Sequence, residues 1–294
     1  MSTNGGLTML TEMLSMLPPS ERKIATYIIE NPQEAISLTA NELGKRSLTS
    51  GAAVIRLCKS LNLKGFQDLK IRVAGDLQKT DVQGFRDIEP NEPVQSIIEK
   101  MTDNSIQTIR ETAELLHIDE IQQAVQVLTN ARKIHFIGVG ASGIIALDAQ
   151  QKFMRINKIS YAFTDLHMAA TQVANAQKDD VVVGISFSGQ TLEVAKVLQL
   201  AKQNDVTTIS LTKYGNSPVT EQADIRLYTS ATKEPTFRSG ATSSRIAQLQ
   251  VMDILFMCVA SINYDDTVTH LNKTRDAIEL LTKNGTRNYN KSNL

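Results

Sequence analysis

The chain has 294 residues, enough for two modest domains, and 41% of them are hydrophobic, as in globular proteins that bury a core. Its 31 basic and 31 acidic residues cancel, so the overall charge indicates no class of partner. Two distant cysteines, Cys58 and Cys258, exclude a disulfide framework or a cysteine metal site and are typical of a reducing cytoplasm. We expect neither a signal peptide nor a membrane-spanning segment, since no apolar run looks long enough.

Basic charge is concentrated in one part of the chain. Residues 45–79 contain eight basic and two acidic residues, which gives this segment a net charge of +6. A local basic excess in a neutral chain predicts that one module alone binds a polyanion.

The first 80 residues have the pattern of short helices with short connections. Ser20 is expected to cap a helix that carries Ile24, Tyr27 and Ile28 on its apolar face. The pair Asn31-Pro32 ends that helix and can begin the next one, with proline at the first helical position.

Two further helices follow across a tight connection. Thr39 and Glu42 form a capping box that opens a helix through Lys45. Thr49 is then expected to cap a helix over 50–61, and Asn62 is expected to end it in the left-handed conformation.

Two short helices joined by three or four residues predict a helix-turn-helix, whose second helix reads the major groove of DNA. Small residues at its start allow a close backbone approach, and its basic residues can neutralise phosphates. The alternative is a helical bundle with a solvated basic face. The predicted DNA-binding residues are Ser50, Gly51, Ala52, Ala53, Arg56 and Lys59.

We divide the chain into a DNA-binding domain (1–80), a linker (81–93), a ligand-binding domain (94–282) and a polar, frayed tail (283–294). The second domain is expected to begin with a helix over 94–116, which either packs inward or forms a dimer interface. The apolar positions of this helix are Ile97, Ile98, Met101, Ile106, Ile109, Ala113 and Leu116.

From Lys133 onward the pattern alternates between strands and helices. This alternation predicts a doubly wound α/β domain with a parallel sheet, in which ligands bind at the carboxyl ends of the strands. The final helix is expected over 245–262. The predicted strands are 133–137, 159–163, 181–186, 207–211 and 225–228, and the predicted helices between them are 143–155, 167–175, 191–203 and 217–223.

A hydroxyl-rich turn follows the apolar strand 181–185 and precedes a helix. Such a turn directs backbone N–H groups and the positive end of the helix dipole toward one point. Ser186, Ser188 and Thr191 add neutral hydroxyl donors around it, and Gln190 lies in the same turn. The pattern predicts an anion site, most simply for a phosphate.

A second turn, Gly138-Val139-Gly140-Ala141-Ser142-Gly143, follows the first strand. It matches the glycine pattern of dinucleotide-binding folds, and Asp165 lies about where a ribose-binding acid would. However, Ser142 adds another hydroxyl, and two hydroxyl-bearing turns suit one compact phosphate better than a pyrophosphate. A phosphorylated small molecule is therefore favoured, with a dinucleotide and a glycine turn without ligand as alternatives.

Three further groups have either a structural or a functional interpretation. Glu193 either contacts the ligand or is a first-turn acid whose charge interacts favourably with the helix dipole. His167 is a ligand contact or a structural histidine. The donor-rich segment 238–245, which begins with Arg238, either closes over a sugar or caps the last helix.

The chain resembles a known family in both halves. The turns 138–143 and 186–191 resemble the phosphate loops of the sugar isomerase (SIS) domain. Residues 53–61 and 64–70 resemble the helix-turn-helix of the RpiR family of bacterial transcription factors. The likeness around Thr242-Ser243-Ser244-Arg245 is greatest to the MurR-type branch.

This resemblance implies a cytoplasmic, homodimeric or homotetrameric regulator that binds operator DNA and needs no cofactor, metal or membrane. Its SIS domain would sense a phosphosugar, in the MurR branch N-acetylmuramic acid 6-phosphate or a related amino-sugar 6-phosphate. The implied ligand-binding residues are Gly140, Ser142, Ser186, Ser188, Gln190 and Thr191.

Two functions from different classes remain. A repressor of amino-sugar catabolic genes uses both modules, whereas a phosphosugar isomerase or an etherase-like enzyme has no evident use for a basic helical module. An enzyme also needs a general base. The available candidates are Glu193, Glu234 and His167, and none lies in a motif that requires this role.

Overall fold

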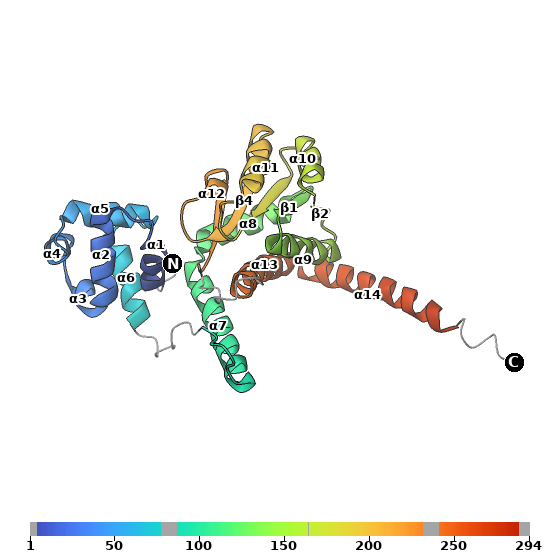
Figure 1. The fold of residues 1–294 in the computed structure, drawn as a ribbon. Helices are drawn as coiled ribbons and strands as arrows, with labels where there is room; N and C mark the ends of the chain where they lie inside the picture. The colour runs from blue at the N-terminus through green and yellow to red at the C-terminus, as the bar shows by residue number, and fades with distance from the viewer. Residues whose placement is uncertain (1–4, 78–86, 164, 232–240, 288–294) are drawn as a thin grey trace.

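The computed structural model describes residues 5–77, 87–163, 165–231 and 241–287. It has an all-helical part followed by an α/β part, which is the predicted fold class (Figure 1). The helical part comprises α1 (Gly6–Met13), α2 (Pro19–Glu30), α3 (Pro32–Ser37), α4 (Ala40–Arg46), α5 (Gly51–Ser60) and α6 (Phe66–Leu77).

The α/β part begins with two helices and then alternates. Its helices are α7 (Val94–Leu115), α8 (Ile118–Asn130), α9 (Ala141–Arg155), α10 (Leu166–Ala174), α11 (Leu192–Gln203), α12 (Pro218–Glu221), α13 (Ser243–Ile262) and α14 (Tyr264–Arg287). Its strands are β1 (Ile134–Gly138), β2 (Ser160–Ala162), β3 (Val181–Ile185), β4 (Thr207–Lys213) and β5 (Ile225–Thr229).

Helix starts in the first part follow the sequence signals with two exceptions. The Thr39–Glu42 capping box is present at α4. Ser20, however, lies inside α2, because Pro19 occupies the first turn and Pro18 is the N-cap. Ser50 rather than Thr49 caps α5, with its side chain accepting from the Ala53 N–H.

The end of α5 is built as predicted. Asn62 has φ +55, in the left-handed region, and the Leu63 N–H donates to the Cys58 carbonyl at 2.8 Å. The Cys58 side chain is buried in the helical core, and this burial raises the pKa of its thiol to about 11. Cys58 is therefore a packing residue whose thiol stays protonated.

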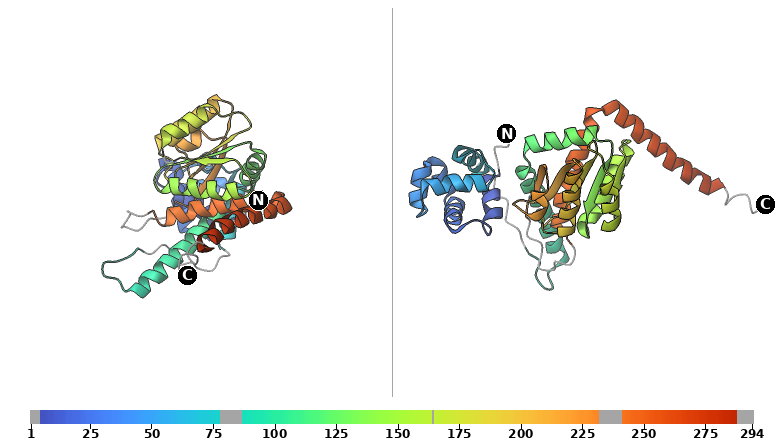
Figure 2. Two further views of the ribbon diagram at one scale, coloured as in Figure 1. Left: turned by 90° about the vertical axis from the view of Figure 1, so that its right-hand side faces the viewer. Right: turned by 90° about the horizontal axis from the view of Figure 1, so that it is seen from above.

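The sheet is parallel throughout, with the strand order β2-β1-β3-β4-β5. Its central strand is buried on both faces. Val181 and Val183 belong to one core cluster with α8, α9 and α13, whereas Val182 belongs to another with α10 and α11. The two helical layers are visible on opposite faces of the sheet (Figures 1 and 2).

Helix α13 corrects the expectation that no run could span a membrane. It is 20 residues long, and an 18-residue window within it has a mean hydropathy of 1.5, so it is long and apolar enough by composition. In the fold, Val251, Met252 and Leu255 of α13 are fully buried in the core of the α/β part. Its hydrophobicity is thus used in a core helix.

Two further helices differ from expectation. The buried face of α7 is mostly polar, with Asn104, Thr108, Thr112 and Leu115 inward, while Ile98 and Ile106 are 56% and 42% exposed. The chain also continues beyond α13 into α14, which projects away from the body (Figure 1). The helix extends to Arg287, past the predicted tail boundary, and the remainder of the tail lies outside the described residues.

Candidate functional site

The two predicted phosphate loops lie at the point where the strand order reverses. The chain leaves β1 for β2 on one side of the sheet, and it leaves β3 for β4 on the other. Gly138, the last residue of β1, pairs with Ile185, the last residue of β3. Loops 138–143 and 186–191 therefore begin side by side at the carboxyl edge, where α/β folds bind ligands.

Two hydroxyl groups meet within the second loop, and a third lies exposed beside them in the sequence. Ser186 is buried, and its Oγ lies 2.9 Å from Thr191 Oγ1. Ser188 and Gln190 are exposed, and Ser188 Oγ accepts from the Gln190 N–H at 3.1 Å. Thr191 is the N-cap of α11, yet its side chain makes no cap hydrogen bond. The loop thus presents neutral donors beside the positive end of a helix.

The tightness of the second loop depends on Gly189. This residue has φ +70, and a Cβ placed on it would lie 2.3 Å from Ser217 Oγ. No other residue type fits this turn without displacing Ser217, because both the backbone conformation and the space require glycine.

The first loop brings in a residue that the sequence analysis missed. Gly140 has φ +58 and is the N-cap of α9. Ser142 is buried, and its Oγ lies 3.1 Å from Nε2 and 3.3 Å from Oε1 of Gln248 on α13. Gln248 is 1% exposed. The sequence signal was weak, because Gln248 is one of two glutamines in the first half of the last helix and nothing local distinguishes it from Gln250.

The acid of the dinucleotide alternative has a structural role. Asp165 is the N-cap of α10 and accepts from the His167 N–H at 2.8 Å. This backbone hydrogen bond, followed by contact with the His167 ring, lowers the pKa of Asp165. The His167 side chain is 99% exposed, and Glu193 is an exposed first-turn acid of α11.

The donor-rich segment is only partly described. Glu234 and Arg238 lie outside the described residues. Ser243 and Ser244 begin α13 and are buried. The geometry therefore supports the helix-opening interpretation for 243–244, while closure over a sugar remains a prediction.

Helix α5 displays most of the predicted DNA-binding residues on one exposed side. Ser50, Ala52 and Lys59 are exposed, and Gly51 is half-buried. The Arg56 side chain is 57% exposed, with Nε 4.0 Å from Glu21 Oε1. Ala53 is 1% exposed and packs in the helical core, so its side chain is not available for the predicted contact with DNA. A helix of 3.6 residues per turn directs Ala53 inward with Val54 and Leu57.

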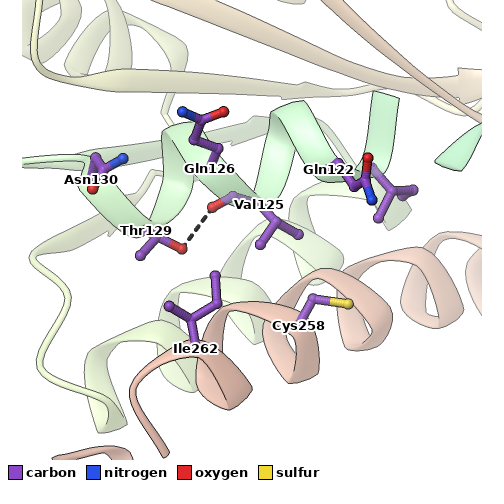
Figure 3. A pocket seen from close by; sticks show the side chains of 8 residues that line it. Gln122, Val125, Gln126, Thr129, Asn130, Cys258 and Ile262 are labelled. Atoms are coloured by element: carbon purple, nitrogen blue, oxygen red, sulfur yellow. Dashed lines mark hydrogen bonds between the residues drawn. The ribbon is translucent and has the colours of Figure 1, made fainter. Parts of the chain in front are cut away.

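One groove in the α/β part lacks the chemistry of the strand-tip loops. A groove of about 450 Å³ lies between α8 and α13 and is lined mainly by apolar side chains and neutral amides, among them Val125, Gln126, Cys258 and Ile262 (Figure 3). Neither phosphate loop lines it. Among the described residues, no three potential metal ligands of the His, Cys, Asp and Glu types lie together.

Comparison with known proteins identifies both parts. Residues 4–80 match the helix-turn-helix domain of the rpiR family, and residues 127–258 match the SIS domain. Two relatives are uncharacterized HTH-type transcriptional regulators, YbbH of Bacillus subtilis and TTE0211 of Caldanaerobacter subterraneus. YbbH is 52% identical over 94% of this chain and 97% of its own length, and TTE0211 is 44% identical over 93% and 97%.

A solved structure extends the likeness to both parts together. The Vibrio vulnificus NanR protein complexed with ManNAc-6P has a TM-score of 0.60 and 26% identity, and the match covers 94% of this chain and 99% of NanR. The helix-turn-helix and SIS matches, in this order and over most of the chain, place the protein in the rpiR family of DNA-binding transcriptional regulators.

Proposed function

We propose that this regulator is a repressor of amino-sugar catabolic genes and that an amino-sugar 6-phosphate, such as N-acetylmuramic acid 6-phosphate, controls it. The main support for this proposal is the pair of hydroxyl-bearing loops at the point where the strand order reverses, together with a basic helical domain in the same chain. The NanR neighbour was solved with ManNAc-6P, which supports an effector of this chemical class.

In this proposal the phosphate binds between the two loops. Ser186, Ser188 and Thr191 donate hydroxyl hydrogen bonds, assisted by the N-terminus of α11. Ser142, held by Gln248, donates from the other loop. Gly140 and Gln190 contribute the backbone approach and a side-chain amide beside the ligand.

On the DNA side, the start of α5 would approach base edges. Ser50, Gly51 and Ala52 allow close approach, while Arg56 and Lys59 neutralise phosphates. Ala53 is omitted because it is buried. We further propose that the regulator acts in the cytoplasm as a homo-oligomer, since helix-turn-helix proteins commonly bind paired half-sites.

The test is Ser188→Ala. The phosphate contact of an exposed serine should be lost with little effect on folding, so effector affinity measured by calorimetry should fall about 10- to 100-fold, the worth of a hydrogen bond to a charged group. DNA binding without effector should persist. Ser261→Ala is the matched control, because Ser261 is an exposed serine near the C-terminal end of α13, whereas Gln248, which contacts the first loop, lies in the first half of that helix.

Unchanged effector affinity in Ser188→Ala would contradict the phosphate role. Titrating N-acetylmuramic acid 6-phosphate and ManNAc-6P separately distinguishes the sugars. Turnover of either sugar at about 1 per second or faster would instead favour an isomerase or lyase.

A further inference from the structure

A few side chains of the α/β part lie in the core of the helical part, and Tyr214 is one of them. Tyr214 directly follows β4 and is 3% exposed. It belongs to the same buried cluster as Leu57 and Leu61. Its hydroxyl donates to the Leu61 carbonyl at 2.7 Å, and Leu61 is the C-cap of α5, the predicted reader helix.

The same segment also holds the second phosphate loop. The Lys213 N–H donates to the carbonyl of Phe187 at 2.8 Å, and Phe187 lies between Ser186 and Ser188. The Val219 N–H donates to the Gly189 carbonyl at 3.2 Å. The loop is therefore hydrogen-bonded to the chain on both sides of Tyr214.

We infer that Tyr214 is a positioning residue that couples occupancy of the phosphate loop to the orientation of the reader helix. A shift of Phe187 on phosphate binding displaces Lys213 and, one residue further, the Tyr214 hydroxyl that holds the end of α5. This inference rests on the proposed function. Because coupling is reciprocal, DNA binding would alter effector affinity by the same factor.

The surroundings of Tyr214 suit a rigid connection. Its ring meets the Tyr228 ring edge-on, with centroids 4.9 Å apart and planes at 61°. Its N–H donates to the Thr229 carbonyl at 3.0 Å. Burial raises the pKa of the Tyr214 hydroxyl above its usual value, so this group remains a donor at neutral pH. The acceptor is one of the last carbonyls of a helix, which lack partners within the helix.

The decisive variant is Tyr214→Phe, which keeps the ring and removes the donor. The matched control is Tyr228→Phe, since Tyr228 is buried in the same cluster and touches Tyr214. The DNA probe is a duplex selected by the parent protein from a randomised pool. For each protein we would measure its affinity with and without N-acetylmuramic acid 6-phosphate or ManNAc-6P, and effector affinity without DNA.

The effector response is the factor by which the sugar phosphate changes the DNA affinity. We expect this factor to fall at least about fivefold in Tyr214→Phe, because fivefold is the lower end of ordinary allosteric coupling. Effector affinity without DNA should stay within about twofold, and Tyr228→Phe should keep the parental factor. An equal factor in Tyr214→Phe and parent would overturn the coupling role, as would an equal fall in both variants. A parent that binds neither sugar phosphate, or does not respond to it, would overturn the proposed function together with the coupling.

Discussion

At the scale of single residues, Glu12 has an unusual environment between the two parts of the chain. Its carboxylate accepts from the Ala231 N–H at 2.9 Å and from Ser230 Oγ at 3.3 Å. The same Ser230 hydroxyl lies 2.8 Å from a carboxylate oxygen of Glu111. Because a hydroxyl has one proton, it cannot donate fully to both carboxylates at once. Burial, followed by the charge of Glu111, raises the pKa of Glu12 to about 7, and Lys213 opposes this shift weakly.

This environment predicts a pH-dependent stability. The pKa of Glu12 is higher in the folded state than its usual value of 4.5, so the folded state binds more protons between pH 4.5 and about 7. The contribution is fully present below pH 4.5 and is lost as pH rises through about 7. The thermal unfolding midpoint, measured from pH 5 to 8.5, should therefore decrease as pH rises to about 7 and stay constant above that pH.

Glu12→Gln keeps an acceptor for the Ala231 N–H but cannot ionise, so it should flatten this decline. Glu30→Gln changes an exposed glutamate of the same helical part and should leave the decline intact. An equally steep decline in parent and Glu12→Gln would show that another group titrates in this range.

Gln248 shows why some residue roles could not be predicted from the sequence. The serines and the threonine of the loops were predictable because hydroxyls after a buried strand are a local signal. The hydrogen bond between Ser142 and Gln248 joins residues 106 positions apart and has no local signal. Its partner could be found only once α13 packed beside α9.

At the scale of elements, helix starts were predicted well where the capping chemistry was complete. Thr39 Oγ1 accepts from the Glu42 N–H at 3.3 Å, and Glu42 Oε2 accepts from the Thr39 N–H at 2.7 Å. Ser20 lacked this reciprocal arrangement, and Pro19 displaced the helix start by its fixed φ.

A pair of alanine variants tests this distinction. Thr39→Ala should lower the free energy of unfolding by about 1 kcal/mol, because it leaves first-turn N–H groups of α4 without their cap. Ser20→Ala should change it by less than about 0.5 kcal/mol, because Ser20 lies inside α2. Chemical denaturation gives both values. A larger loss from Ser20→Ala would mean that Ser20, not Pro18, is the functional cap.

The two helices that flank the SIS core show the limit of periodicity. Helix α7 has isoleucines on a side that stays exposed and threonines on the side that is buried. Thr112 Oγ1 accepts from the Ser230 N–H at 3.3 Å, so a polar contact with the end of β5 helps set which face turns inward. Helix α14 was missed because it packs little against its own body and needs no full apolar face.

At the scale of the whole molecule, we expect DNA binding and effector binding to belong to different parts. Arg56→Ala should weaken operator binding and lower the slope of log affinity against log salt by about 1, because one phosphate contact is lost. Effector affinity measured without DNA should be unchanged, since Arg56 is an exposed residue of the helical part and both loops belong to the α/β part. DNA-binding titrations at several salt concentrations provide the measurement.

Lys178→Ala is the control, because this exposed lysine precedes β3 in the α/β part. It should leave the salt slope at the parental value. Equal operator affinity for Arg56→Ala and parent would remove Arg56 from the DNA interface.

The amino-acid sequence alone determined the alternation of strands and helices from β1 to α13, the parallel sheet and the position of both hydroxyl loops, because these follow from periodicity and from turn chemistry within a few residues. Only the tertiary structure decided that Ala53 is buried, that Gln248 holds Ser142, and that Tyr214 reaches Leu61 across 153 residues. Such contacts depend on how distant elements pack against one another, and no local pattern encodes that geometry.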